Sequence, residues 1–206
     1  MQIKMHPLGD IGANCYTLLS DEAAIVIDPG EFSQGVCDFL AENSQKKRII
    51  LLTHCHFDHI GGAAALRELT GTQIAIGEKE LEHTLDPIKT QSAYFGIFIE
   101  PFKADTAIRD GETLKIGDIE IKCIETPGHT VGGMCYLIDD NLFSGDTLFR
   151  MSIGRTDFEN GSFTDISSSI RKLYSALEDD TTVFPGHGEP TKIGYEKKYN
   201  PFVRSI

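Results

Sequence analysis

Short apolar runs separated by turn residues set the pattern of the first half of the chain. These runs are rich in β-branched residues and predict strands at 3–5, 15–19, 24–27, 49–52 and 73–76. Between them, apolar residues recur at helical spacing and predict helices at 34–43, 62–69 and 78–85. The run at 49–52 is apolar throughout, so we expect its strand to be buried.

The second half repeats this order of strands followed by a helix. It predicts strands at 112–115, 119–124, 133–138, 141–144 and 182–184, and an amphipathic helix at 164–177. A weak echo links segments 14–30 and 133–147, although chance similarity between two hairpins explains it nearly as well. Two β-rich halves, about 1–110 and 111–206, predict one domain of the α+β class, with two sheets face to face and helices outside.

Segment 86–105 is the least predictable part of the chain. It is aromatic and apolar but has no clean period. Core packing is the default explanation for such residues, and a loop that covers the substrate is the alternative. The sequence leaves both open.

The charge balance narrows the classes of partner. The chain of 206 residues carries 31 acidic and 19 basic side chains, a formal charge of −12. Such a surface disfavours nucleic-acid backbones and anionic membranes, and no run approaches the roughly 18 apolar residues of a membrane span. The amino-terminal residues lack the apolar core of a signal peptide, and the five cysteines show no C-x-x-C pairing, which indicates reduced thiols. We therefore expect a cytoplasmic protein that binds neither nucleic acid nor membrane.

A dense group of metal-binding side chains follows the apolar run at 49–52. The segment reads THCHFDHIGG and contains His54, His56, Asp58 and His59. Loops at the carboxyl ends of strands are where α/β proteins usually build their sites. Imidazoles and a carboxylate at this density indicate a bound metal, and the H-x-H alternation places two histidines on one side of an extended chain.

Three later segments share one design, in which a β-type run ends and glycine flanks a single histidine or aspartate. The side chains are His129 in TPGH, Asp146 in SGDT and His187 in PGHG. Glycine allows close approach of the backbone at such turns, so the side chain can stand at the strand end without crowding.

These seven candidate ligands exceed the shell of one tetrahedral metal. Nitrogen and carboxylate donors in this ratio suit zinc, iron or manganese rather than calcium or magnesium, and zinc is the first expectation. Two divalent ions that share Asp146 would use all seven, and such a pair can activate a water and polarise a carbonyl together. His6 and His83 fit no motif, and Asp28 in IDPG is interpreted as structural.

The ordered pattern H-x-H-x-D-H, H, D, H resembles that of the metallo-β-lactamase superfamily, and the resemblance runs from NCY at 14–16 to GHG at 186–188. It implies a four-layer αββα sandwich with the site at one edge of the two sheets. It also implies a first metal on His54, His56 and His129, a second on Asp58, His59 and His187, and Asp146 as the bridge.

Within the superfamily, segment 145–163 (GDTLFRMSIGRTDFENGSF) resembles the hydroxyacylglutathione hydrolases (glyoxalase II), particularly a compact single-domain type. The resemblance implies hydrolysis of a thioester such as S-lactoylglutathione by a metal-bridging hydroxide that Asp58 orients. It also implies that Arg155 helps to hold a glutathione carboxylate, and pairing of Arg155 with Asp157 is the equally weighted alternative. Only residues 191–206 follow the last motif, so we do not expect the C-terminal helical domain of the larger enzymes.

A second enzyme class fits the same motifs. Persulfide dioxygenases of the superfamily also resemble the chain, in the THCH motif and the GRTDF loop, and would use a single Fe(II) on His54, His129 and Asp146. The segment FRMSIG at 149–154 favours the hydrolase. A β-lactamase is disfavoured, because those enzymes lack the bridging aspartate.

Overall fold

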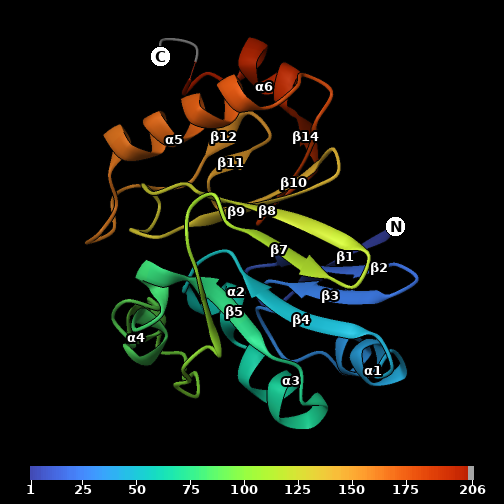
Figure 1. Ribbon diagram of the computed structural model, residues 1–206. Coiled ribbons are helices and arrows are strands. Elements are labelled where there is room, and N and C mark those ends of the chain that lie inside the picture. Colours follow the sequence, from blue (N-terminus) through green and yellow to red (C-terminus); the bar gives the residue numbers. More distant parts are fainter. Residues whose placement is uncertain (204–206) are drawn as a thin grey trace.

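Four layers stack across the protein in the computed structural model, which describes residues 1–203 (Figure 1). Two six-stranded sheets lie face to face. Helices α1 and α3 cover the outer face of one sheet, and α5 and α6 cover the outer face of the other. The predicted αββα sandwich is confirmed. Of the predicted domain 1–206, residues 204–206 lie outside the described residues.

The first sheet has the order β1-β2-β3-β4-β5-β6. Its strands are β1 (Gln2–Leu8), β2 (Ala13–Leu19), β3 (Ala23–Ile27), β4 (Lys47–Leu52), β5 (Ile74–Gly77) and β6 (Thr106–Ile108). The helical segments of this half are α1 (Gln34–Glu42), α2 (Phe57–Ile60), α3 (Ala63–Thr70), η1 (Glu78–Glu80), η2 (His83–Leu85) and α4 (Ser92–Phe95). β3 to β6 pair in parallel, so helices and the second sheet cover both faces, which explains why β3 and the end of β4 are apolar throughout.

The second sheet has the order β14-β13-β10-β9-β8-β7. Its strands are β7 (Thr113–Ile116), β8 (Ile119–Glu125), β9 (Met134–Ile138), β10 (Asn141–Gly145), β13 (Thr182–Pro185) and β14 (Thr191–Lys192). A small hairpin of β11 (Leu148–Phe149) and β12 (Ser152–Ile153) precedes helices α5 (Phe163–Ala176) and α6 (Ile193–Tyr199). Among residues 1–203, no helix is both long and apolar enough to cross a bilayer.

Three apolar clusters hold the layers together. Between the sheets, inward residues such as Ile25, Leu51 and Phe143 pack against each other. Because side chains alternate along a strand, Val26 points the other way and packs beneath the helices of the first half. A third cluster joins the second sheet to α5, and all five cysteines are buried as free thiols.

The echo between the halves has a counterpart in the topology. β2 and β3 form an antiparallel hairpin whose second strand pairs in parallel with β4. β9 and β10 form an antiparallel hairpin whose second strand pairs in parallel with β13. The two hairpins therefore share one pairing pattern, although β2-β3 lies nearer the edge of its sheet than β9-β10 does.

Segment 86–105 lies partly in the core and partly at the surface. Phe102 is buried beneath the first sheet, whereas Phe95 and Phe98 are 54% and 82% exposed. The single helix predicted at 78–85 is wrong, because the chain forms two separate 3-10 turns there. The first turn directs the Glu80 side chain inward, where it accepts hydrogen bonds from two backbone N–H groups.

Candidate metal centre

Four strand ends bring the candidate ligands to one edge of the two sheets. The segment after β4 carries His54 and His56 and then enters α2, which carries Asp58 and His59. The other ligands follow three strands of the second sheet: His129 after β8, Asp146 after β10 and His187 after β13. All seven predicted residues therefore meet, although they come from both halves of the chain.

One group consists of three buried histidines. Ring nitrogens of His54, His56 and His129 all lie within 4.8 Å of one another. His129 donates through Nδ1 to the Arg155 carbonyl at 2.8 Å, so its Nε2 faces inward, 2.9 Å from His56 Nδ1. Two imidazole nitrogens that converge at this separation can serve one metal ion.

A second group consists of Asp58, His59 and His187. His187 Nε2 lies 3.2 Å from Asp58 Oδ2, and His59 Nε2 lies 3.6 Å from the same oxygen. Asp146 stands between the groups: its Oδ1 is 3.4 Å from His59 Nε2, and its Oδ2 is 3.5 Å from His129 Nε2. The carboxylate is therefore in place to serve both groups.

The donor atoms fit bound metal ions. Among the described residues, three buried polar atoms of this site have no hydrogen-bond partner: His54 Nε2, His59 Nε2 and Asp146 Oδ1. Buried polar atoms are nearly always paired, so each unpaired atom calls for an explanation. Metal coordination satisfies all three, since each is an imidazole nitrogen or a carboxylate oxygen.

Burial and neighbouring charges set the protonation states in the protein alone. Burial, reinforced by the other histidines, lowers the pKa of His54 well below its usual value and the pKa of His56 to about 3. Both rings are therefore neutral at pH 7 and able to bind a metal. Burial alone would lower the pKa of His59, but Asp146, Asp58 and Asp28 outweigh it and raise that pKa. Burial alone would likewise raise the pKa of Asp58, but His59 and His187 outweigh it and hold that pKa below its usual range.

Asp28 supports two of the candidate ligands. Its carboxylate accepts hydrogen bonds from His59 Nδ1 at 2.9 Å and from the Thr53 hydroxyl at 2.6 Å. Because the Thr53 proton goes to Asp28, the Thr53 oxygen accepts from His54 Nδ1 at 3.0 Å. Both histidines are thereby left with a free Nε2. The structural interpretation of Asp28 was incomplete, because the residue orients two rings of the site.

Gly186 shows why glycine flanks these side chains. A Cβ at this position would lie 2.1 Å from Asp146 Oδ1 and 2.7 Å from His59 Cε1. Any larger residue would therefore intrude between two candidate ligands.

A cleft of about 260 Å³ opens over the site. Phe57, Phe149 and Phe158 form apolar walls, and Arg155 lies on the rim. The Arg155 guanidinium donates two hydrogen bonds to Asp157, at 2.9 and 2.8 Å, which is the pairing that the sequence offered as the alternative. Both side chains of this ion pair are exposed to solvent.

Glu80 joins the two histidine-bearing loops, a role that the sequence does not predict. The side chain is fully buried and accepts from the N–H of Cys55 at 3.2 Å and from that of Gly132 at 2.8 Å. Burial alone would raise the pKa of Glu80, but the His83 and Cys55 side chains and the Gly132 N–H outweigh it and lower that pKa to about 2. The carboxylate therefore remains charged at neutral pH.

Replacing Glu80 with glutamine is expected to lower the free energy of unfolding of the metal-free protein by about 3 kcal/mol at pH 7, because two buried N–H groups lose a charged acceptor. The folded-state pKa is lower than the unfolded one, so the wild-type advantage is complete above about pH 4.5 and disappears as the pH falls towards about 2. Urea unfolding at several pH values checks this. Glu82→Gln, at an exposed position nearby, is the control and should leave the free energy of unfolding unchanged. Equal stability of E80Q and the wild type would contradict the role of Glu80.

Comparison with known proteins identifies the family of the chain. A model of the metallo-beta-lactamase superfamily matches residues 8–187. Hydroxyacylglutathione hydrolase GloC of Haemophilus influenzae is 34% identical over 210 residues, which span 100% of this chain and 99% of the relative. The crystal structure of the BLEG-1 B3 metallo-beta-lactamase is similar with a TM-score of 0.90 and 36% identity, over 98% of this chain and 99% of that one.

Two further structures are similar over nearly the whole chain. TTHA1623, solved in a di-iron-bound form, has a TM-score of 0.85 and 28% identity, over 97% of this chain and 99% of that one. ETHE1 from Myxococcus xanthus has a TM-score of 0.79 and 27% identity, over 100% of this chain and 85% of that one. Because the family model matches most of the chain, the chain belongs to the metallo-β-lactamase superfamily, whose members bind divalent metals.

Proposed function

We propose that the protein is a metal-dependent hydrolase that cleaves thioesters such as S-lactoylglutathione. The observation that carries the proposal is the meeting of two ligand groups around Asp146. Similarity to hydroxyacylglutathione hydrolase GloC along the whole chain supports a thioester as the substrate class.

The proposed ligands divide into two sets that share one carboxylate. His54, His56 and His129 would hold the first divalent ion, Asp58, His59 and His187 would hold the second, and Asp146 would serve both. When bound, such a pair supplies a Lewis acid for the thioester carbonyl and a water that ionises near neutral pH. Zinc is the first choice, and this donor set also accepts iron or manganese.

The chain's own side chains position the reaction. Asp58 borders the cleft, and its lowered pKa keeps it an acceptor at neutral pH, so it can orient the attacking water by accepting its hydrogen bond. Phe57, Phe149 and Phe158 give the cleft apolar walls, and a substrate that displaces water from it would strengthen the electrostatic contacts inside. Asp28 holds the His59 ring in the required direction.

Arg155 is proposed to bind a glutathione carboxylate by exchanging its partner Asp157. Replacing Arg155 with alanine is expected to raise KM for glutathione thioesters about fivefold with little change in kcat, because an exposed ionic contact contributes modestly to binding. Steady-state kinetics checks this, with Arg171→Ala on the exposed side of α5 as the control. An equal rise in KM for the thioester of a neutral thiol would exclude a carboxylate contact.

A mononuclear Fe(II) persulfide dioxygenase is the second candidate, favoured by the similarity to ETHE1. It would use His54, His129 and Asp146 and leave the other four candidate ligands without metal. The buried Nε2 of His59 would then stay unpaired, which favours the hydrolase.

Parallel assays on the purified protein separate these functions. We expect cleavage of S-lactoylglutathione by a protein with two metal ions per chain, and no oxygen uptake with glutathione persulfide. A single iron with oxygen consumption and no thioester cleavage would overturn the proposal. A β-lactam is included because of the similarity to BLEG-1, and lactam cleavage without thioester cleavage would equally overturn it.

A further inference from the structure

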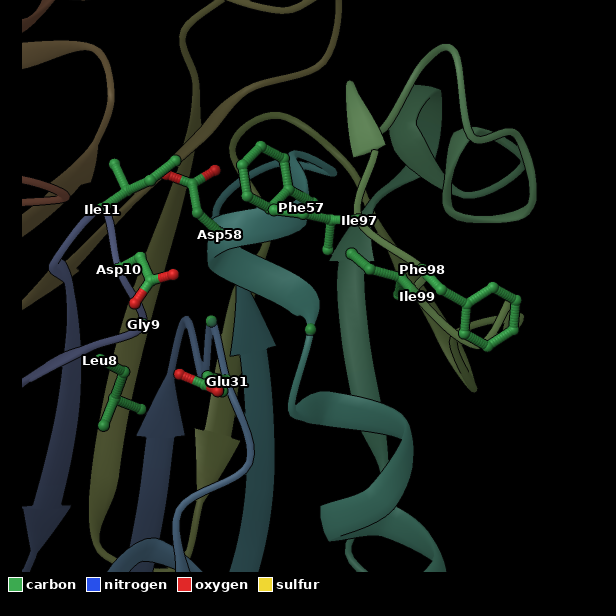
Figure 2. A pocket seen from close by; sticks show the side chains of 12 residues that line it. Leu8, Gly9, Asp10, Ile11, Glu31, Phe57, Asp58, Ile97, Phe98 and Ile99 are labelled. Carbon is green, nitrogen blue, oxygen red and sulfur yellow. The ribbon is translucent and has the colours of Figure 1, made fainter. Parts of the chain in front are cut away.

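A second cavity adjoins the metal cleft and is built from the first half of the chain (Figure 2). It measures about 300 Å³ and lies between the turn that joins β1 to β2 and the segment that follows α4. Ile11, Phe57 and Asp58 line both this cavity and the metal cleft. The cleft and the cavity therefore meet at these three side chains.

The cavity combines apolar walls with two carboxylates. Ile97 and Ile99 form one side, and Asp10 and Glu31 come from the side of the strands. Among residues 1–203, no lysine, arginine or histidine lines it. Arg155 lines the metal cleft but not this cavity, so the two ends of the combined space differ in charge.

Nothing in the described part of the chain neutralises these two carboxylates. Asp10 and Glu31 form no ion pair and no side-chain hydrogen bond with residues 1–203. Asp58 differs, because His59 and His187 face it and it is a proposed metal ligand. Asp10 and Glu31 therefore contribute unpaired negative charge to the lining of the cavity.

We propose that this cavity is the subsite for the acyl group of the thioester, and that it selects an apolar acyl chain whose far end is neutral or positively charged over one that ends in a carboxylate. The inference rests on the proposed function, because the reacting carbonyl must lie in the metal cleft for the acyl chain to pass Phe57. Burial of the chain against Ile97 and Ile99 provides affinity. The charges of Asp10 and Glu31 provide selectivity.

Glutathione thioesters with acyl chains of increasing length test the apolar part. Each added methylene is expected to raise kcat/KM about fourfold until the cavity is filled. Among six-carbon chains, one that ends in an ammonium group is expected to exceed one that ends in a carboxylate roughly tenfold in kcat/KM at low salt. The ratio should fall at high salt, because the carboxylates are solvent-accessible.

The double variant Asp10→Asn, Glu31→Gln tests the charged part. It keeps the shape of the cavity and is expected to reduce the ammonium-to-carboxylate ratio to about twofold or less. The control Glu68→Gln, Glu178→Gln removes the same charge from exposed positions outside the cavity and should leave the ratio unchanged. A ratio that survives the first double variant, or that never exceeds one in the wild type, would overturn the subsite.

Binding without turnover separates this inference from the proposed function. We would measure by calorimetry how tightly the zinc-loaded protein binds the hexyl, aminohexyl and carboxypentyl thioethers of glutathione. Their affinities should follow the order expected for kcat/KM, with the carboxypentyl compound weakest. If that order holds while no thioester is cleaved, the subsite stands and the thioesterase function falls. If thioesters are cleaved but the three thioethers bind equally or not at all, the function stands and the subsite falls.

Discussion

Replacing Asp146 with asparagine is expected to lower kcat/KM for thioester hydrolysis about 10³-fold and to reduce the metal content of the protein. The Asp146 oxygens lie 3.4 Å from His59 Nε2 and 3.5 Å from His129 Nε2, so one carboxylate faces both ligand groups. Asparagine keeps the shape but loses the negative charge. Loss of one partner of a buried charged contact costs roughly 4 kcal/mol, which corresponds to about three factors of ten in rate. Steady-state kinetics and elemental analysis measure both effects.

Two further variants sharpen this result. Asp140→Asn, at an exposed position in the turn before β10, is the matched control and should keep the wild-type rate. His187→Ala should remove a ligand of the second ion only, and the rate should fall about 100-fold with one metal retained. Wild-type metal content and rate in D146N would show that Asp146 is not a ligand.

Replacing Gly186 with alanine is expected to lower the rate about 100-fold or more, although alanine carries no charge and removes no ligand. The added Cβ would lie 2.1 Å from Asp146 Oδ1, far inside contact distance. The backbone cannot easily move away, because the Gly186 N–H donates to the Gly145 carbonyl at 2.8 Å and the Gly186 carbonyl accepts from the Asn14 N–H at 2.7 Å. Asp146 must move instead, and a displacement near 1 Å at a reacting centre costs about 10² in rate. Kinetics and metal content measured on the same preparation check this.

Gly35→Ala is the matched control for the added methyl group. Gly35 lies in α1, and the atom nearest to its added Cβ is Ser33 Oγ at 3.8 Å, which is ordinary contact. Alanine favours a helix over glycine by about 1 kcal/mol, so the melting temperature should stay equal or rise. Full activity and metal content in G186A would contradict the close approach of Gly186 to the ligands.

Much of the layer structure could be predicted from hydrophobic periodicity. The buried strand at 49–52 is the end of β4, and the helices at 34–43 and 62–69 correspond closely to α1 and α3. These elements carry their own signal, since each buries one or both faces. The strands β6, β11, β12 and β14 were missed, because they have two or three residues each and owe their conformation to neighbouring strands rather than to a pattern of their own.

The candidate ligands were visible in the sequence for a chemical reason. They lie at or shortly after the ends of β-type runs, and histidines and aspartates gathered in this way are typical of a metal site. Their convergence depends on topology, because strands from two sheets must end at one edge. From the sequence, this convergence could be predicted only because the order of the motifs resembles that of the superfamily.

The supports around the ligands could not be predicted in the same way. Glu80 lies in the charged stretch EKELEH, where an inward carboxylate looks like any surface acid. Its burial and its two backbone donors become visible only when the loops at Cys55 and Gly132 are side by side. The acidic cavity was also hidden, because Asp10, Glu31 and segment 97–99 are far apart in the sequence.

Zinc titration of the metal-free protein, followed by the rate of S-lactoylglutathione hydrolysis, tests the central proposal most directly. The proposal predicts that the rate reaches its plateau at two zinc ions per chain, and that His187→Ala reaches a much lower plateau at one. A plateau of the wild type at one ion per chain would contradict the two-metal site, and no hydrolysis at any zinc content would contradict the thioesterase function.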